Sequence, residues 1–187
     1  MDRTLVQMTA LGDVDPLVVE IGPYRIAERC DVALASLAMR RGQDKAFAAA
    51  AKNAGIPLPA PARAAGGVPY GAFWVAPEMW FVEAAFATHA DVLAHLKPVF
   101  GDAASVTEQT DAWVRLDVTG AGLAELFARL SNLDLAVLPD GYASRTVIDH
   151  LGCYLIRRGP GDITVYGPRS SAGSLLHALE VAATSLV

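Results

Sequence analysis

The sequence has few of the features that place a protein in a membrane or outside the cell. It contains no apolar run of 18 residues, and its N-terminal region carries Asp2, Asp13 and Asp15 where a secretion signal has a basic and then an apolar stretch. Its two cysteines, Cys30 and Cys153, are far apart and form no Cys-x-x-Cys motif. We therefore expect a cytoplasmic protein with no membrane span and with two buried free thiols.

Basic charge is also scarce. The net charge is −5 and the isoelectric point is about 5.3, and the basic pairs that stand out are Arg40-Arg41 and Arg157-Arg158. Because phosphate binding needs a basic face, no nucleic-acid partner is expected. Hydrophobic residues make up 53% of the 187 residues, enough for a packed core, and the mean hydropathy is +0.33. The high hydropathy indicates either apolar surface covered by a partner protein or simply alanine runs such as 48–51.

The common catalytic and ligand-binding motifs are absent as well. There is no G-x-G-x-x-G, no G-x-x-x-x-G-K-[ST] and no G-x-S-x-G, so dinucleotide, triphosphate and serine-hydrolase functions have no local support. His89 and His95 are six apart on one expected helix, which points them to different sides and disfavours a metal site. Asp149 and His150 are neighbours near a strand end and face opposite ways, so we expect a structural histidine. The sequence thus predicts no catalytic, cofactor-binding or metal-binding residues.

What the sequence does contain is an order of elements that occurs twice, about 80 residues apart. In the second half, residues 113–118 alternate with strand periodicity, and Leu123, Leu126, Phe127 and Leu130 form the apolar stripe of a helix. Strands are expected at 145–148, 153–156 and 163–166, with a tight turn at 159–162 between the last two, and a final helix from about residue 170.

The first half has the same order in a looser form. A strand is expected at 32–39, a helix at 44–54 closed by Gly55, and a loop at 57–69. Two strands, 73–75 and 80–82, flank a turn at 77–78. The next helix continues to Phe100 and is opened by Thr88 and Asp91, whose side chains are expected to satisfy free amides at its start.

These patterns predict an α+β fold in which helices cover one face of each mostly antiparallel sheet. The domains expected are an N-terminal arm at 1–31, a first α+β unit at 32–104 and a second unit at 105–187, forming one compact body. The segment 17–23 reads as an arm or an edge strand, and the sequence gives it no place in either sheet.

The densest aromatic segment contains Trp74 and Trp80, on either side of the turn at 77–78. Such a segment forms either ordinary core or a contact surface for a partner or a flat ligand. Alternation along the strands suggests that one tryptophan is buried and the other is not.

Several segments, taken in order, resemble the gamma subunit family of heterotetrameric sarcosine oxidase over almost the whole chain from about Val32. The segments that carry this resemblance are Ala35-Ser36-Leu37-Ala38-Met39-Arg40-Arg41-Gly42, Phe73-Trp74-Val75-Ala76-Pro77-Glu78-Met79-Trp80, Glu108-Gln109-Thr110-Asp111, Arg145-Thr146 and Gly167-Pro168-Arg169-Ser170-Ser171. The chain departs from the family pattern at Ala76, where the family commonly has glycine, and at 108–111, where it has an Asp-x-Ser-Asp stretch.

The resemblance implies two interlocked ferredoxin-like units, as in the folate-binding portion of the glycine-cleavage T-protein. It further implies a non-catalytic subunit with no cofactor of its own. The implied partners are alpha, beta and delta subunits that hold NAD, tetrahydrofolate, FAD, FMN and zinc, in a complex that oxidatively demethylates sarcosine to glycine. Trp74, Trp80 and Arg169 are the candidate partner contacts.

Two other functions stay open from the residues. A stand-alone folate-binding enzyme or regulator of the same fold needs a buried carboxylate for the pterin ring, and the candidates are Glu83, Asp111 and Glu125. A homodimer with no metabolic role would need none of these residues. Catalytic activity of this chain alone is not expected.

Overall fold

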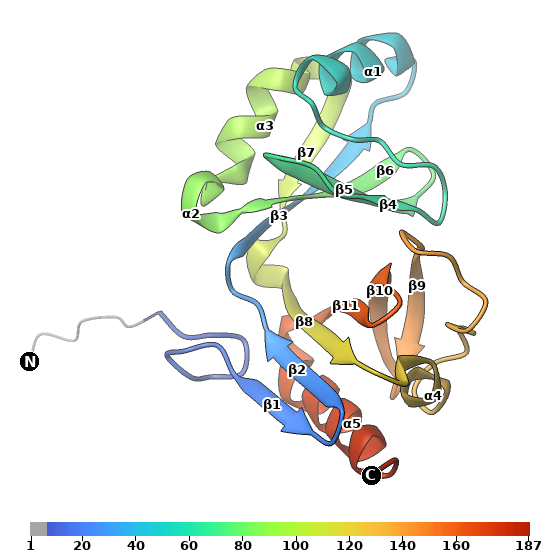
Figure 1. Cartoon of the computed structure of the whole chain (residues 1–187). Helices are drawn as coiled ribbons and strands as arrows, with labels where there is room; N and C mark the ends of the chain where they lie inside the picture. The colour runs from blue at the N-terminus through green and yellow to red at the C-terminus, as the bar shows by residue number, and fades with distance from the viewer. Residues whose placement is uncertain (1–6) are drawn as a thin grey trace, which may run out of the picture.

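The computed structural model describes residues 7–187 as two antiparallel sheets packed face to face, with helices on both outer sides. Figure 1 shows the helices α1 and α3 above the first sheet and α4 and α5 below the second. The expected α+β fold with two units is thereby confirmed. Within the described residues, no helix is both long and apolar enough to cross a membrane.

The first sheet has the strand order β4-β5-β6-β3-β7. Its strands are β3 (Val32–Met39), β4 (Ala64–Ala65), β5 (Tyr70–Ala76), β6 (Met79–Ala85) and β7 (Ala104–Glu108). The helices α1 (Asp44–Asn53), α2 (Phe86–His89) and α3 (Val92–Phe100), followed by the 3-10 turn η1 (Gly101–Ala103), belong to this half. The pattern β-α-β-β-α-β of β3, α1, β5, β6, α3 and β7 is that of a ferredoxin-like unit.

The second sheet has the order β1-β2-β8-β11-β10-β9. Its strands are β1 (Val18–Ile21), β2 (Tyr24–Glu28), β8 (Trp113–Gly120), β9 (Ala143–Ile148), β10 (Leu151–Gly159) and β11 (Asp162–Pro168). The helices α4 (Leu123–Ala128) and α5 (Ala172–Thr184) and the 3-10 turns η2 (Thr110–Ala112) and η3 (Arg169–Ser171) complete this half.

The N-terminal strands interlock the two units. In the first sheet β7, which follows α3, pairs with β3. Strand β2 takes the equivalent position and pairs antiparallel with β8 from Tyr24↔Gly120 to Glu28↔Leu116. The segment 17–23, which the sequence left without a place, therefore contains the edge strand β1 and its turn, and β2 beside it is the fourth strand of the second unit.

Three layers of apolar side chains follow from strand alternation. One layer joins α1 and α3 to the first sheet, and another joins α4 and α5 to the second sheet. The third lies between the sheets and contains Leu34, Phe73, Phe81, Ile156 and Tyr166 among its buried residues. The two faces of each sheet are thus both covered by protein.

The expected helices and strands are present with small shifts of their ends, except that the helix expected to run to Phe100 is divided into α2 and α3. Strands β2, β4 and β7 were not anticipated, and the chain crosses from the first sheet to the second between β7 and β8. At the start of α3 only part of the expected cap forms, because Asp91 accepts from the backbone N–H of Ala94 at 2.9 Å whereas the Thr88 hydroxyl donates to the carbonyl oxygen of Ala85.

Candidate functional site

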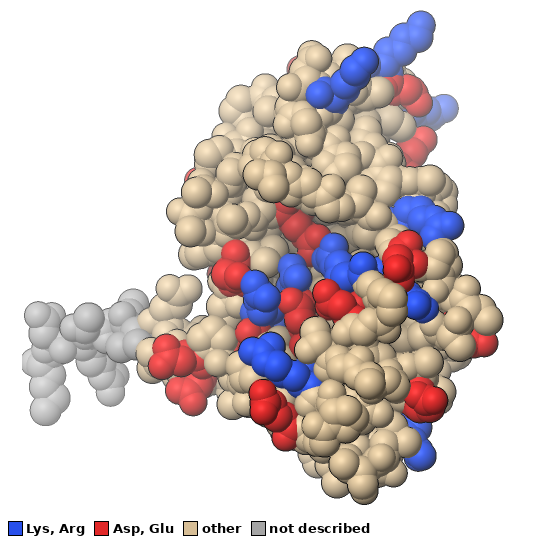
Figure 2. Space-filling view, viewed as in Figure 1, with Lys and Arg blue, Asp and Glu red and all other residues tan. Residues whose placement is uncertain are grey.

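A charged cluster interrupts the apolar layer between the sheets. Strand alternation in β8 turns Arg115 and Asp117 toward the first sheet, opposite Glu83 of β6. Glu83 is 7% exposed and Asp117 is 8% exposed, so both carboxylates are buried. Figure 2 shows acidic and basic side chains side by side in the hollow between the two halves. The sequence indicated the polar face of β8, but not that a second sheet covers it.

Glu83 is the residue that links the two units in this cluster. Its Oε1 atom accepts from Arg158 Nη2 at 2.6 Å, from the Tyr166 hydroxyl at 2.7 Å and from Arg115 Nη1 at 3.3 Å. All three donors lie in the second sheet. One carboxylate of the first unit therefore receives two ionic bonds and one neutral bond from the second.

Asp117 completes the cluster within the second sheet. It accepts from Arg115 through both oxygens, at 2.9 and 3.0 Å, and from the Thr164 hydroxyl at 2.8 Å. Burial and the Glu83 carboxylate raise the pKa of Tyr166 well above its ordinary value, so its hydroxyl remains protonated and donates. Among the described residues, no buried side-chain nitrogen or oxygen lacks a hydrogen-bond partner. The cluster is thus internally satisfied, which is typical of a structural joint.

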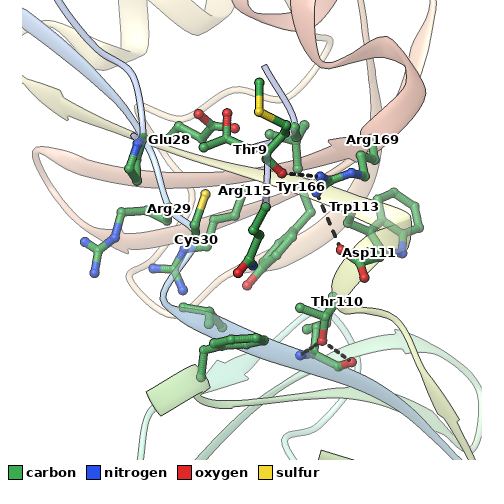
Figure 3. A pocket seen from close by; sticks show the side chains of 18 of the residues that line it. Thr9, Glu28, Arg29, Cys30, Thr110, Asp111, Trp113, Arg115, Tyr166 and Arg169 are labelled. Carbon is green, nitrogen blue, oxygen red and sulfur yellow. Dashed lines mark hydrogen bonds and ion pairs between the residues drawn. The ribbon is translucent and has the colours of Figure 1, made fainter. Parts of the chain in front are cut away.

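A pocket of about 900 Å³ opens beside this cluster. Its wall combines the N-terminal segment around Thr9, the link between β2 and β3 with Arg29 and Cys30, and Trp113 and Tyr166 of the second sheet (Figure 3). Its size is in the range of small-molecule sites. The pocket therefore lies where the N-terminal segment meets both units.

The arginines of the pocket wall are already paired. Arg29 binds Asp31, Arg115 binds Asp117, and Arg169 lies 3.6 Å from Asp111. Figure 3 shows Arg169 between Asp111 and the N-terminal segment, where its Nη2 donates to the carbonyl oxygen of Met8 at 2.9 Å. These cations hold protein segments together.

Glu28 also holds the N-terminal segment in place, and nothing in the sequence predicted this role. Its side chain is almost fully buried, and its two oxygens accept from the backbone N–H groups of Leu11 at 3.1 Å and Leu17 at 3.2 Å. Cys30 follows two residues later and is exposed, contrary to the expectation of two buried thiols. Partial desolvation of its sulfur and the nearby Glu28 carboxylate nevertheless raise the pKa of Cys30, which disfavours the nucleophilic thiolate.

The two candidate tryptophans face the helix side of the first sheet. Trp74 and Trp80 are cross-strand partners in β5 and β6, so they share a face, and both are half-buried rather than one buried and one exposed. Trp80 stacks on Phe47 with ring centroids 5.5 Å apart, and its Nε1 donates to the carbonyl oxygen of Pro59 at 2.8 Å. Neither tryptophan lines the pocket that Arg169 lines.

The three candidate carboxylates for a pterin lie in different surroundings. Glu83 is buried between the sheets, the Asp111 side chain is 87% exposed at the pocket rim, and Glu125 is exposed on α4. The structure thus leaves Glu83 as the buried candidate, and its Oε1 already accepts three bonds. Residues 7–187 contain no group of three or more His, Cys, Asp or Glu side chains placed to hold a metal ion.

Comparison with known proteins shows which solved structures share this fold. No protein-family model and no curated protein sequence matches the chain. Among solved structures, a chain of the heterotetrameric sarcosine oxidase from Corynebacterium sp. U-96 matches with a TM-score of 0.78 and 20% identity, over 90% of this chain and 87% of that one. The glycine cleavage system aminomethyltransferase T from Bartonella henselae matches with a TM-score of 0.58 and 15% identity, over 81% of this chain but 44% of that one. The chain shares its fold with the oxidase chain and with a part of the aminomethyltransferase.

Proposed function

We propose that this chain is a non-catalytic gamma-type subunit of a heterotetrameric sarcosine oxidase. The observation that carries the proposal is that the match to a chain of such an oxidase extends over nearly the full length of both chains. The match to the aminomethyltransferase leaves more than half of that enzyme without a counterpart. A whole-chain match favours an equivalent subunit, whereas a partial match favours only a shared module.

In this role the chain is a rigid body that fixes the relative position of larger cytoplasmic alpha and beta subunits and a small delta subunit. The joint at Glu83 supports this role, because it ties the two units together through buried ionic bonds. The flavins, NAD, tetrahydrofolate and zinc then belong to the partner subunits, and the complex oxidatively demethylates sarcosine to glycine.

The test is reconstitution with the partner subunits from the same genome, with and without this chain. We expect the complex lacking it to be less soluble or to lose sarcosine oxidase activity, and supply of the purified chain to restore both. A three-subunit assembly that is fully active and equally stable without this chain contradicts the scaffold role.

Trp74 and Trp80 offer a matched pair for locating the contact surface. Trp74→Ala is expected to weaken copurification with the partner subunits while changing the stability of the isolated chain little. Trp80→Ala is expected to destabilise the isolated chain by about 2–4 kcal/mol, because it removes the stacking on Phe47 and the bond to Pro59. Unchanged copurification of Trp74→Ala removes that residue from the proposed contacts, and the same assay applies to Arg169→Ala.

A stand-alone folate-binding enzyme or regulator is the second candidate, favoured by the aminomethyltransferase fold and by the pocket of about 900 Å³. Titration calorimetry of the isolated chain with tetrahydrofolate separates the two functions. A dissociation constant at or below about 10 μM favours the folate function. In that case Asp111→Asn, in the wall of that pocket, is expected to weaken binding, whereas Glu125→Gln, on the outer helix α4, is the control.

A further inference from the structure

Two histidines that the sequence pattern separates lie next to each other in the fold. The expectation that His89 and His95 point to different sides assumed one continuous helix, and this assumption is wrong. Helix α2 ends at His89, Ala90 and Asp91 form a break, and α3 begins at Val92. The imidazole ring centroids are 4.5 Å apart, with 44° between the ring planes.

The ring of His89 is held in an orientation suited to a metal ligand. Thr88 donates its hydroxyl hydrogen to the carbonyl oxygen of Ala85 at 3.3 Å, and its oxygen lies 2.8 Å from His89 Nδ1. Because that hydroxyl is already used as a donor, it accepts from Nδ1–H, which leaves the lone pair on Nε2. A second hydrogen bond that fixes the tautomer in this way is characteristic of metal-binding histidines.

The surroundings also hold the His89 ring in place. Tyr70 packs edge-on against it with ring centroids 5.1 Å apart. His95 is exposed, so its side chain is free to turn its nitrogen toward the same point.

We propose that His89 and His95 together bind one divalent transition-metal ion at the surface, beside the break between α2 and α3. With metal–nitrogen distances of about 2.0 Å, two imidazoles on one ion have ring centroids about 4.5 Å apart at a right-angled N–metal–N geometry and about 5.2 Å apart at a tetrahedral one. The observed 4.5 Å places both rings within reach of one ion, and the exposed His95 ring can turn to complete either geometry. Imidazole suits Cu²⁺, Ni²⁺ and Zn²⁺, and the general order of affinities places Cu²⁺ highest.

The site offers two protein ligands. Asp91 is the carboxylate at the break, but it uses Oδ1 to cap α3, and the described residues gather no third His, Cys, Asp or Glu around the pair. Water completes the coordination, so the affinity is moderate, with a dissociation constant on the order of 10 μM. This site is independent of the proposed subunit role.

The experiment is titration calorimetry of the full chain, purified without a histidine tag, with NiCl₂ and separately with ZnCl₂. We expect each ion to bind with a stoichiometry of one per chain. His89→Gln and His95→Gln should each weaken Ni²⁺ binding at least about 10-fold, and Thr88→Ala should weaken it several-fold by releasing the His89 ring. His177→Gln, on α5, is the control and should leave binding unchanged.

A second readout reports the ligands directly. Cu²⁺ bound to the unmodified chain should give an electron paramagnetic resonance spectrum with coupling to two imidazole nitrogens, reduced to one in His95→Gln. Circular dichroism verifies that each variant is folded. The proposal is overturned if no saturable binding occurs below about 1 mM, or if the affinity is the same in the His89 and His95 variants as in the unmodified chain.

Discussion

Substitution of Glu83 by glutamine tests whether the buried ionic joint holds the two units together. The substitution keeps the size of the side chain and an oxygen that accepts hydrogen bonds, but it removes the negative charge. Arg158 then has no carboxylate partner and keeps only neutral acceptors, the glutamine oxygen and the Thr164 hydroxyl at 3.2 Å, whereas Arg115 keeps the Asp117 carboxylate. The variant therefore isolates the charge that one unit contributes to the other.

The expected cost follows from the burial of the partners. Removal of one member of a buried ion pair costs about 3–5 kcal/mol, because the other charge stays buried without compensation. The Arg158 side chain is 22% exposed and Arg115 retains a partner, so water and Asp117 offset part of this cost. We expect Glu83→Gln to lower the free energy of unfolding by about 2–3 kcal/mol and the melting temperature by about 4–12 °C.

Urea unfolding followed by both tryptophan fluorescence and circular dichroism measures this change, and agreement between the two probes tests two-state behaviour. Glu125→Gln removes the same charge from the exposed face of α4 and should change stability by no more than about 0.5 kcal/mol. If Glu83→Gln costs less than about 1 kcal/mol, comparable to this control, the joint contributes little and the reasoning is refuted.

Further substitutions test the backbone conformation at Gly120 and the burial of the Cys153 thiol. Gly120→Ala should destabilise the chain by more than about 2 kcal/mol, because φ is +142° and a Cβ atom would lie 2.1 Å from the Pro23 carbonyl oxygen. Gly159→Ala is the control, because a Cβ atom there would have no heavy atom within 4 Å, and it should have a small effect in the same thermal melt. Burial raises the pKa of Cys153 to about 11, so a thiol reagent should modify only the exposed Cys30 in the native chain and both thiols in urea. Since the folded pKa lies above the value of 9.0 for a free thiol, this group's contribution to stability is present below pH 9 and is lost as the pH rises toward 11, and Cys153→Ala should remove that dependence. Rapid modification of both thiols in the native chain would contradict the burial of Cys153.

Local periodicity explains why the architecture was visible in the sequence. The alternation in residues 113–118 and the apolar stripe from Leu123 to Leu130 depend on neighbours within one turn or one strand, so they predict β8 and α4 without knowledge of the fold. The order of elements, repeated twice, then predicts two similar units. Glycine at 42 and at 120 marks the equivalent strand ends.

The sequence could not predict which elements meet across long distances. Strand β2 carries the same local signals as any short strand, and its place beside β8 depends on pairing with residues about 90 positions later in the sequence. The expectation that His89 and His95 point to different sides holds only for one continuous helix. The chain breaks after His89, and the two rings lie side by side.

The amino-acid sequence by itself determined most of the strands and helices and the presence of a polar face on β8, because these are properties of neighbouring residues. Only the tertiary structure decided that this polar face meets Glu83 instead of water, since alternation is identical whether a strand's second face is solvated or covered. The joint between the units, the pocket beside it and the histidine pair all arise where distant segments come into contact. Such contacts are set by packing of whole elements, which local sequence does not encode.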